Sequence, residues 1–215
     1  MSTRSVARDL VRDHGQTFAE ECGIDLSRGT PGPLWQLLCA AVLYGAPISS
    51  VNATRAARGL REEGLRTARR VRDSSWEERV RILDEAGYTR YDERTATTLG
   101  DLAGQLEHDY GGDLRKLRER AGRDPDTERS LLKQGKGVGD VGVDIFFREA
   151  QVIWHELRPF ADRRALRAAE SRGLPAGAEE LQDLVGPRDV PRLVAALVRV
   201  GPAGDGRAAS RRGQR

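Results

Sequence analysis

A glycine-punctuated turn between two helical runs constrains this chain more than any other feature. The charged run from Glu128 to Lys133 leads into Gln134-Gly135-Lys136-Gly137-Val138-Gly139, and an apolar-periodic run follows at once over residues 141–153. This pattern predicts a helix, a tight hairpin and a second helix. Because Gly137 and Gly139 leave the backbone bare where the second helix begins, its first N–H groups can bind an anion such as a phosphate.

Other interpretations of this turn are possible. Residues 137–142 satisfy the pattern G-x-G-x-x-G, and Asp162 follows at about the distance of a ribose-binding acid. A dinucleotide fold needs a buried strand before the first glycine, whereas residues 127–134 are charged and Leu-rich. No Gly-Lys-Ser/Thr closes a Walker-type loop. An ordinary glycine-rich helix connection stays open, but the pattern favours a helix-hairpin-helix, which binds a nucleic-acid backbone without reading its sequence.

The charge balance permits nucleic-acid binding without requiring it. The 215 residues include 36 basic side chains, of which three are lysines, against 33 acids, and the formal net charge is +3 with a pI of about 9.1. The two signs are interspersed along the chain, so any basic face must be formed by folding.

Neither a metal site nor a membrane segment is predicted. The two cysteines, Cys22 and Cys39, form no disulfide framework and no zinc-binding spacing, and Cys39 lies among apolar residues as a buried side chain would. No stretch of about 20 apolar residues is present. We therefore expect a cytoplasmic protein with no metal ligands, and DNA binding through the hairpin would make it nucleoid-associated.

Apolar residues at helical spacing predict an all-α fold. The clearest stripe is Leu34, Leu37, Leu38, Ala41 and Val42. Further helices are expected at residues 6–20, 48–60, 76–86, 162–172, 178–185 and 190–200, together with a long one after Asp92 with Thr95, Leu99, Leu102, Leu106 and Tyr110 on one face. From residue 201 to 215 the chain is rich in Gly, Ala, Ser and Arg and is expected to be a disordered basic tail.

Two segments carry a family resemblance. The hairpin from Leu131 to Gly139, followed by Arg158-Pro159-Phe160-Ala161-Asp162-Arg163-Arg164-Ala165-Leu166, resembles the hairpin and following aspartate of endonuclease III-like base-excision DNA glycosylases, the HhH-GPD superfamily. Residues 38–52 look like the early core helix of that family and the loop after it. The resemblance covers residues 33–174.

The resemblance implies a two-lobed helical fold with a DNA-binding cleft between the lobes. It places a six-helix lobe at residues 32–134 and the helix-hairpin-helix with its following helix at 135–153. A second helical lobe would combine residues 1–31 with 154–200.

The resemblance also implies roles for particular residues. Asp162 matches the catalytic aspartate of the family, which stabilises positive charge on the sugar and activates water; an N-cap of the next helix is the alternative role. The DNA-binding residues would be Lys133, Lys136, Gly137, Val138 and Gly139. Pro47 would probe the gap left by a flipped base, or simply stop a helix, while Tyr44, Tyr88 and Tyr91 are weaker candidates for a base pocket, with ordinary packing as the alternative.

Three departures from the family narrow the expected activity. Val141 stands where bifunctional relatives carry a nucleophilic lysine, so lyase activity is expected to be weak or absent. No cysteine follows Cys39, so the iron–sulfur loop of many relatives is missing. Residues 40–42, Ala-Ala-Val, lack the glutamate of the adenine-specific branch.

These features together predict a monofunctional glycosylase acting on double-stranded DNA with a damaged or mismatched base. It would need no cofactor, although hairpin carbonyls in this family can hold a monovalent cation. The alternative is a non-catalytic helix-hairpin-helix DNA-binding protein. The sequence specifies neither the lesion nor the oligomeric state.

Overall fold

Helices make up the regular structure of this protein. The computed structural model describes residues 2–203, and within that range it contains no strand, which confirms the all-α prediction. None of the described helices is long and apolar enough to cross a membrane. The basic segment expected at 201–215 lies, from residue 204 onward, outside the described residues.

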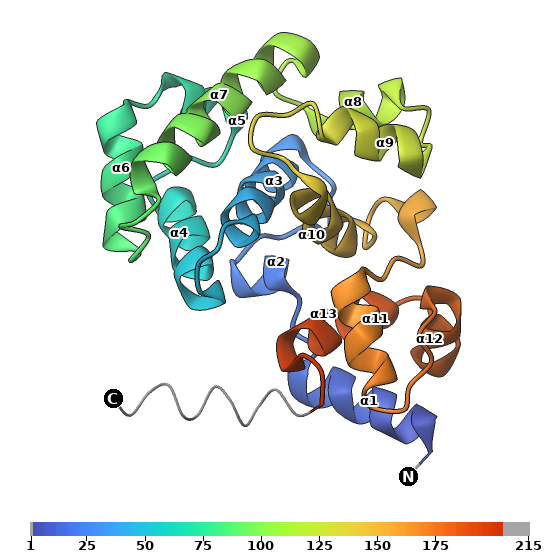
Figure 1. Ribbon diagram of the computed structural model, residues 1–215. Helices are drawn as coiled ribbons and strands as arrows, with labels where there is room; N and C mark the ends of the chain where they lie inside the picture. The colour runs from blue at the N-terminus through green and yellow to red at the C-terminus, as the bar shows by residue number, and fades with distance from the viewer. Residues whose placement is uncertain (1, 204–215) are drawn as a thin grey trace, which may run out of the picture. The chain divides into compact units, whose positions relative to one another are not determined.

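Among the described helices, α3 (Pro31–Gly45) and α7 (Asp92–Tyr110) are the longest. In chain order, and with the labels of Figure 1, the elements are α1 (Thr3–His14), α2 (Phe18–Glu21), α3 (Pro31–Gly45), α4 (Ser50–Glu62), α5 (Ala68–Asp73), α6 (Trp76–Glu85), α7 (Asp92–Tyr110), α8 (Leu114–Arg120), α9 (Pro125–Leu132), α10 (Asp140–Ala150), the 3-10 turn η1 (His155–Leu157), α11 (Arg163–Glu170), α12 (Ala178–Val185) and α13 (Val190–Val200).

The chain divides into two compact units. Unit 1 combines Met1–Phe18 with Leu157–Arg215, and unit 2 is the continuous segment Ala19–Glu156. Helix α1 therefore groups with α11, α12 and α13, while residues 19–31 and 154–156 group with the hairpin in unit 2.

Helix α3 is the centre of unit 2. Leu34, Trp35 and Leu43 are wholly buried, and every residue between Trp35 and Leu43 except the half-buried Gln36 is buried too. A helix that is apolar all round must be surrounded by other elements, and α3 packs against both α4 and α10. The stripe predicted at residues 34–42 is confirmed, and it fixes the position of the hairpin helix α10 within unit 2.

Helix α7 supplies the second long element of unit 2. The predicted stripe Thr95, Leu99, Leu102, Leu106 and Tyr110 is buried, and α5 and α6 pack against this helix. The helix ends at Gly111, whose left-handed conformation places its N–H on the carbonyl of Glu107.

Unit 1 has its own apolar core. Small residues on the buried face of α11, among them Ala165 and Ala168, allow close packing against α13, which confirms the helix predicted at residues 190–200. The core of this unit consists of Ala7, Ala165, Ala168, Ala169, Leu174, Leu181, Val190, Leu193, Val194, Leu197 and Val198.

One predicted helix was wrong, and one short helix was not predicted. The single helix expected over residues 6–20 is interrupted at Gly15, whose N–H bonds back to the carbonyl of Val11, and α2 begins only at Phe18. Glycine is a poor helix former and readily ends one. Helix α5 was missed because it has only six residues, although Thr67 caps its N-terminus by accepting a bond from the Arg70 N–H.

Candidate nucleic-acid interface

The predicted hairpin is present at residues 133–139, between α9 and α10. Helix α9 begins after Asp124, which caps it, with Pro125 in the first position. Gly137 has φ +76°, and a Cβ at this position would overlap the Cγ2 of Thr98 on α7. Two independent constraints, backbone conformation and space, therefore require glycine at 137.

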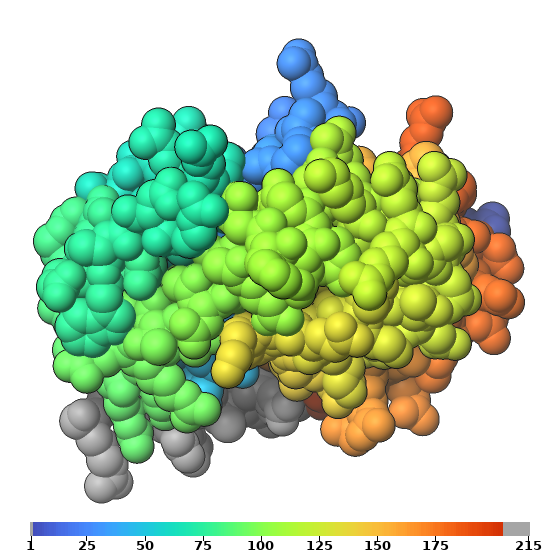
Figure 2. Space-filling view, turned by 90° about the horizontal axis from the view of Figure 1, so that it is seen from above, coloured from blue at the N-terminus to red at the C-terminus, as the bar shows by residue number. Residues whose placement is uncertain are grey.

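The hairpin is fastened to α7. Val138 is buried, and the side chain of Gln105 on α7 both donates to the carbonyl of Gln134, at 3.0 Å, and accepts from the N–H of Lys136, at 3.2 Å. Figure 2 shows the gold hairpin region at the surface beside the green atoms of α7. The turn is thus exposed but held in one conformation, as a preformed binding site requires.

The first turn of α10 carries no side-chain cap. Its N-cap residue is Gly139, around which nothing occupies the space of a Cβ, and Gly139, Asp140 and Val141 are all exposed. The N–H groups at this end of α10 point out of the helix and have no intrahelical acceptor. They form a site at which the phosphate of a nucleic-acid strand can accept hydrogen bonds.

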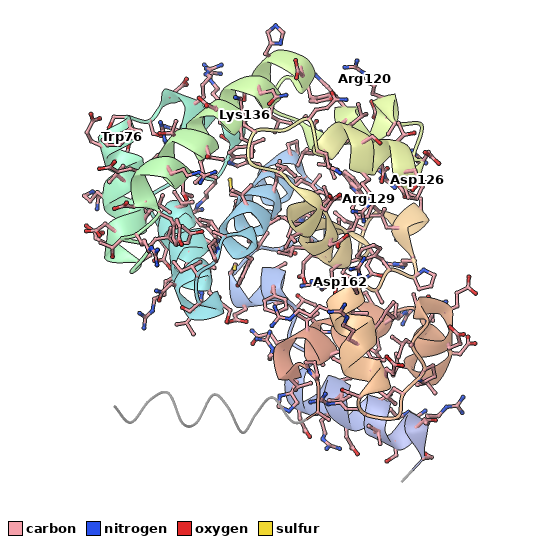
Figure 3. All side chains as sticks on the ribbon, in the orientation of Figure 1. Trp76, Arg120, Asp126, Arg129, Lys136 and Asp162 are labelled. Atoms are coloured by element: carbon pink, nitrogen blue, oxygen red, sulfur yellow. The ribbon has the colours of Figure 1, made fainter. Side chains whose placement is uncertain are left out.

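Charges around the turn are partly neutralised. Lys133 Nζ lies 2.7 Å from Asp140 Oδ1, which lowers the pKa of that carboxyl and keeps it ionised. Arg129 of α9 pairs with Asp144 of α10, also at 2.7 Å. Lys136, labelled at the turn in Figure 3, makes no ion pair with any residue that the structure describes. Of the two lysines predicted to face phosphates, only Lys136 therefore offers a charge that is not already paired.

The turn carrying Pro47 lies next to the start of α10. A Cβ on Gly45, at the end of α3, would be 4.0 Å from the amide nitrogen of Gly142. Pro47 is exposed, and so is Val51 in the first turn of α4. Pro47, the hairpin glycines and Lys136 all belong to unit 2.

The three tyrosines differ in their surroundings. Tyr88 is wholly buried, and its hydroxyl donates to the carbonyl of Leu43 at 2.8 Å, while burial raises its pKa to about 12. It therefore packs the core of unit 2 and cannot stack on a base, which corrects that prediction. Tyr44 is half-buried with its hydroxyl 2.6 Å from Thr54 Oγ1, and Tyr91 precedes α7 with the guanidinium of Arg90 5.6 Å from its ring centre.

A cluster of polar side chains around Tyr44 was not predicted from the sequence. Buried Thr54 lies 3.3 Å from a Glu21 oxygen, and the Cys22 thiol lies 3.5 Å from the Tyr44 hydroxyl, with burial raising the pKa of both Cys22 and Tyr44. Nearby, Glu149 accepts the N–H of Ala19 at 2.8 Å. The only sequence signal was that Glu149 falls on the apolar side of α10, where a carboxylate needs a partner.

Asp162 is the N-cap of α11. Its Oδ1 accepts the N–H of Ala165 at 2.9 Å, and the residue is only 6% exposed. The capping role that the sequence left open is therefore observed, and Figure 3 labels the residue at the start of α11. Asp162 belongs to unit 1, whereas the hairpin belongs to unit 2.

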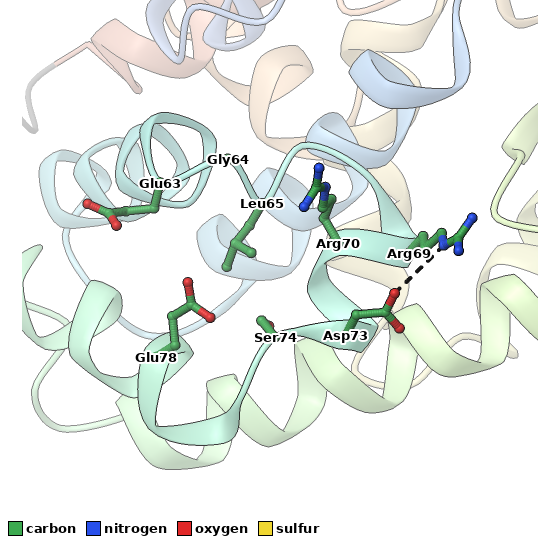
Figure 4. Close-up of a pocket in the computed structure, with 8 residues that line it drawn as sticks. All are labelled: Glu63, Gly64, Leu65, Arg69, Arg70, Asp73, Ser74 and Glu78. Carbon is green, nitrogen blue, oxygen red and sulfur yellow. Dashed lines mark ion pairs between the residues drawn. The ribbon is translucent and has the colours of Figure 1, made fainter.

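A hollow of about 680 Å³ lies elsewhere in unit 2, along α5 and the ends of α4 and α6 (Figure 4). Arg69 pairs with Asp73 across 3.7 Å on its wall. Its lining mixes cations with acids and includes none of the predicted site residues: Glu63, Gly64, Leu65, Arg69, Arg70, Asp73, Ser74 and Glu78.

Comparison with known proteins does not assign this chain to a family. No protein-family model, curated protein or solved structure matches this chain. In the described part of the chain, no group of three or more His, Cys, Asp or Glu side chains is arranged to hold a metal ion.

Proposed function

We propose that this chain is a monofunctional DNA N-glycosylase with the two-lobed helix-hairpin-helix fold, acting on a damaged or mismatched base in duplex DNA. The observation that carries the proposal is the hairpin: exposed, uncapped N–H groups at the start of α10, beside the unpaired Lys136, on a turn held by Gln105. Such groups bind phosphates at any sequence. A protein that searches DNA for rare lesions needs this kind of contact.

The proposed chemistry divides between the two units. A base must leave the duplex before its glycosidic bond is accessible, at a cost of a few kcal/mol, and the hairpin in unit 2 would supply backbone binding that offsets this cost. As the bond breaks, positive charge builds on the sugar, and the carboxylate of Asp162 would stabilise it and orient the attacking water. The capping bond to Ala165 fixes the orientation of that carboxylate.

Water is the proposed nucleophile because the hairpin helix offers no amine. Val141 is 59% exposed at the position of the lyase lysine in bifunctional relatives. Water adds to the sugar carbon, the base leaves with a proton, and an abasic site remains. No cofactor enters this scheme, and a monovalent cation on the hairpin carbonyls would only assist phosphate binding.

The second candidate is a non-catalytic helix-hairpin-helix DNA-binding protein. One observation favours it: Asp162 is almost wholly buried and already has a structural role as an N-cap. In this case the hairpin would bind DNA and no base would be released.

Asp162→Asn separates the two candidates. Asparagine is as good an N-cap as aspartate, so the fold should be preserved. We expect the wild-type protein to produce alkali-labile abasic sites in at least one duplex of a panel carrying uracil, hypoxanthine, alkylated or oxidised bases, and the variant to lose roughly 100-fold or more of that rate while still binding DNA.

Asp189→Asn is the matched control. Asp189 is an exposed N-cap residue of α13 in the same unit, and its substitution removes the same charge. It should leave product formation unchanged. Strand breaks without alkali would show a lyase, and absence of product from the wild-type protein on every duplex would favour the non-catalytic candidate.

A further inference from the structure

Helix α11 has two sharply different faces. Ala165, Ala168 and Ala169 are wholly buried in the core of unit 1, while Arg163, Arg164 and Arg167 are exposed. We call these three arginines the α11 arginine face. Positions 163 and 167 are one turn apart and 164 lies beside them, so the three guanidinium groups can reach the same side of the helix.

The α11 arginine face has no acidic partner in the described structure. None of the three guanidinium groups makes an ion pair or hydrogen bond with residues 2–203, and Glu170 is the one acid within the helix. Several exposed arginines elsewhere are paired with acids: Arg12 with Asp9 and Asp13, Arg81 with Glu63 and Glu85, and Arg115 with Asp113.

The position of these arginines opposes the helix dipole. Cations at the N-terminus of a helix are unfavourable, and acids are favoured there. Helices α6, α7, α9 and α12 carry two acids each in the first turn. Helix α11, like α1, α3, α4, α5, α8 and α13, has none, and it begins with Arg163 and Arg164. The capping carboxylate of Asp162 is the one acid at this helix end, and no described side chain pairs with the three guanidinium groups.

We propose that the α11 arginine face binds the phosphate backbone of duplex DNA, as a second contact surface in addition to the hairpin. Guanidinium groups bind phosphate oxygens bidentately and stay charged at any physiological pH. Each DNA strand presents one charge per about 3.4 Å of its axis. Arginines on consecutive helix turns are about 5.4 Å apart, so their long side chains can reach more than one phosphate of a strand. The choice of duplex DNA as partner rests on the proposed function, but the surface itself does not depend on catalysis by Asp162.

The salt dependence of DNA binding tests this surface. In the triple variant Arg163→Gln/Arg164→Gln/Arg167→Gln, the slope of log K against log salt concentration should become shallower by about 0.9 for each phosphate that is no longer neutralised. The total change should be about 2–3. Affinity for an undamaged duplex at low salt should fall by roughly 10-fold or more. Circular dichroism and thermal unfolding of the full chain establish that the variant is folded.

Two control variants distinguish the effect of the α11 arginine face from a general loss of positive charge and from binding by the hairpin. Arg12→Gln/Arg81→Gln/Arg115→Gln removes the same charge from paired arginines and should keep the wild-type slope. Lys136→Gln should weaken binding through the hairpin alone.

Each outcome decides one point. A wild-type slope in the α11 variant, together with weaker binding by Lys136→Gln, would overturn the second surface and leave the proposed function standing. A reduced slope in a protein that releases no base would support the surface and remove the glycosylase. Equal losses in the α11 variant and the paired-arginine control would overturn the proposal, as would failure of the wild-type protein to bind duplex DNA. An α11 variant that binds polyglutamate more weakly but duplex DNA as wild type does would overturn it in favour of an acidic protein partner.

Discussion

At the scale of single residues, the most unusual group in the described structure is the carboxyl of Glu128. The residue is wholly buried in α9, and the group that faces its carboxyl is the carboxylate of Glu156, to which a protonated Glu128 can donate a hydrogen bond. Arg118 is already engaged by Glu156 in a bidentate pair, with N–O distances of 2.5 and 2.6 Å. Burial is the main reason that the pKa of Glu128 is raised to about 8, and the neighbouring Glu156 is the second. The charge of Arg118 lowers this pKa, while that of Asp124 raises it.

This raised pKa makes stability pH-dependent. The folded state holds a proton that the unfolded chain releases near pH 4.5, so the stabilisation is complete below about 4.5 and is lost as the pH rises to about 8. We expect the free energy of unfolding to fall over this window, by at most about 1.4 kcal/mol per pH unit. Glu156 acts in the opposite direction below that window, because Arg118 lowers its pKa although burial opposes the shift.

Glu128→Gln should abolish most of the decline. The amide is neutral at every pH and nearly the same size, so urea unfolding between pH 5 and 8 should give a flatter profile and a variant more stable than wild type at pH 8. Exposed Glu119→Gln, on α8, is the control and should keep the wild-type slope. Parallel profiles for Glu128→Gln and wild type would show that this carboxyl is not the proton-binding group.

At the scale of elements, the hairpin contains an ion pair that competes with its proposed ligand. Lys133 is held by Asp140, the first residue of α10, so a phosphate at this helix end would meet one neutralised cation and one anion. Asp140→Asn should release Lys133 and tighten binding of a duplex roughly two- to five-fold at low salt, as expected from the strength of an exposed ion pair. The gain should vanish at high salt.

Asp126→Asn provides the matched control for this gain. Asp126 is an exposed acid in the first turn of α9, makes no ion pair with described residues and is labelled in Figure 3. Its substitution changes the net charge equally but should leave affinity unchanged. Unchanged affinity in Asp140→Asn as well would show that Lys133 does not contact the backbone.

Elements with strong apolar periodicity could be predicted from the sequence, and contacts across elements could not. Helices α3, α7 and α13 follow from their stripes because burial of an apolar face fixes such helices. The glycine spacing likewise predicted the hairpin, but not that Gln105, about 30 residues earlier in the chain, would hold it. The Lys133–Asp140 pair, the buried Glu128 and the cluster around Tyr44 all depend on tertiary packing, which local propensity does not encode.

At the scale of the whole molecule, each unit has an apolar core of its own. Unit 2 is continuous in the chain and is built around α3, whereas unit 1 joins α1 to the C-terminal helices through a core rich in alanine and valine. Proposed roles divide in the same way, because the hairpin lies in unit 2, and Asp162 and the α11 arginine face lie in unit 1.

This division predicts the behaviour of residues 19–156 expressed alone. We expect the fragment to fold, because a segment of this size with a buried central helix can form a stable domain. It should show a helical circular dichroism spectrum and one cooperative urea transition, and it should bind duplex DNA through the hairpin with a shallower salt dependence than the full chain, since the α11 arginines are missing. Without Asp162 it should release no base. The Lys136→Gln fragment is the control for hairpin binding, and a fragment that is unfolded, or that binds with the full-length slope, would contradict this division of roles.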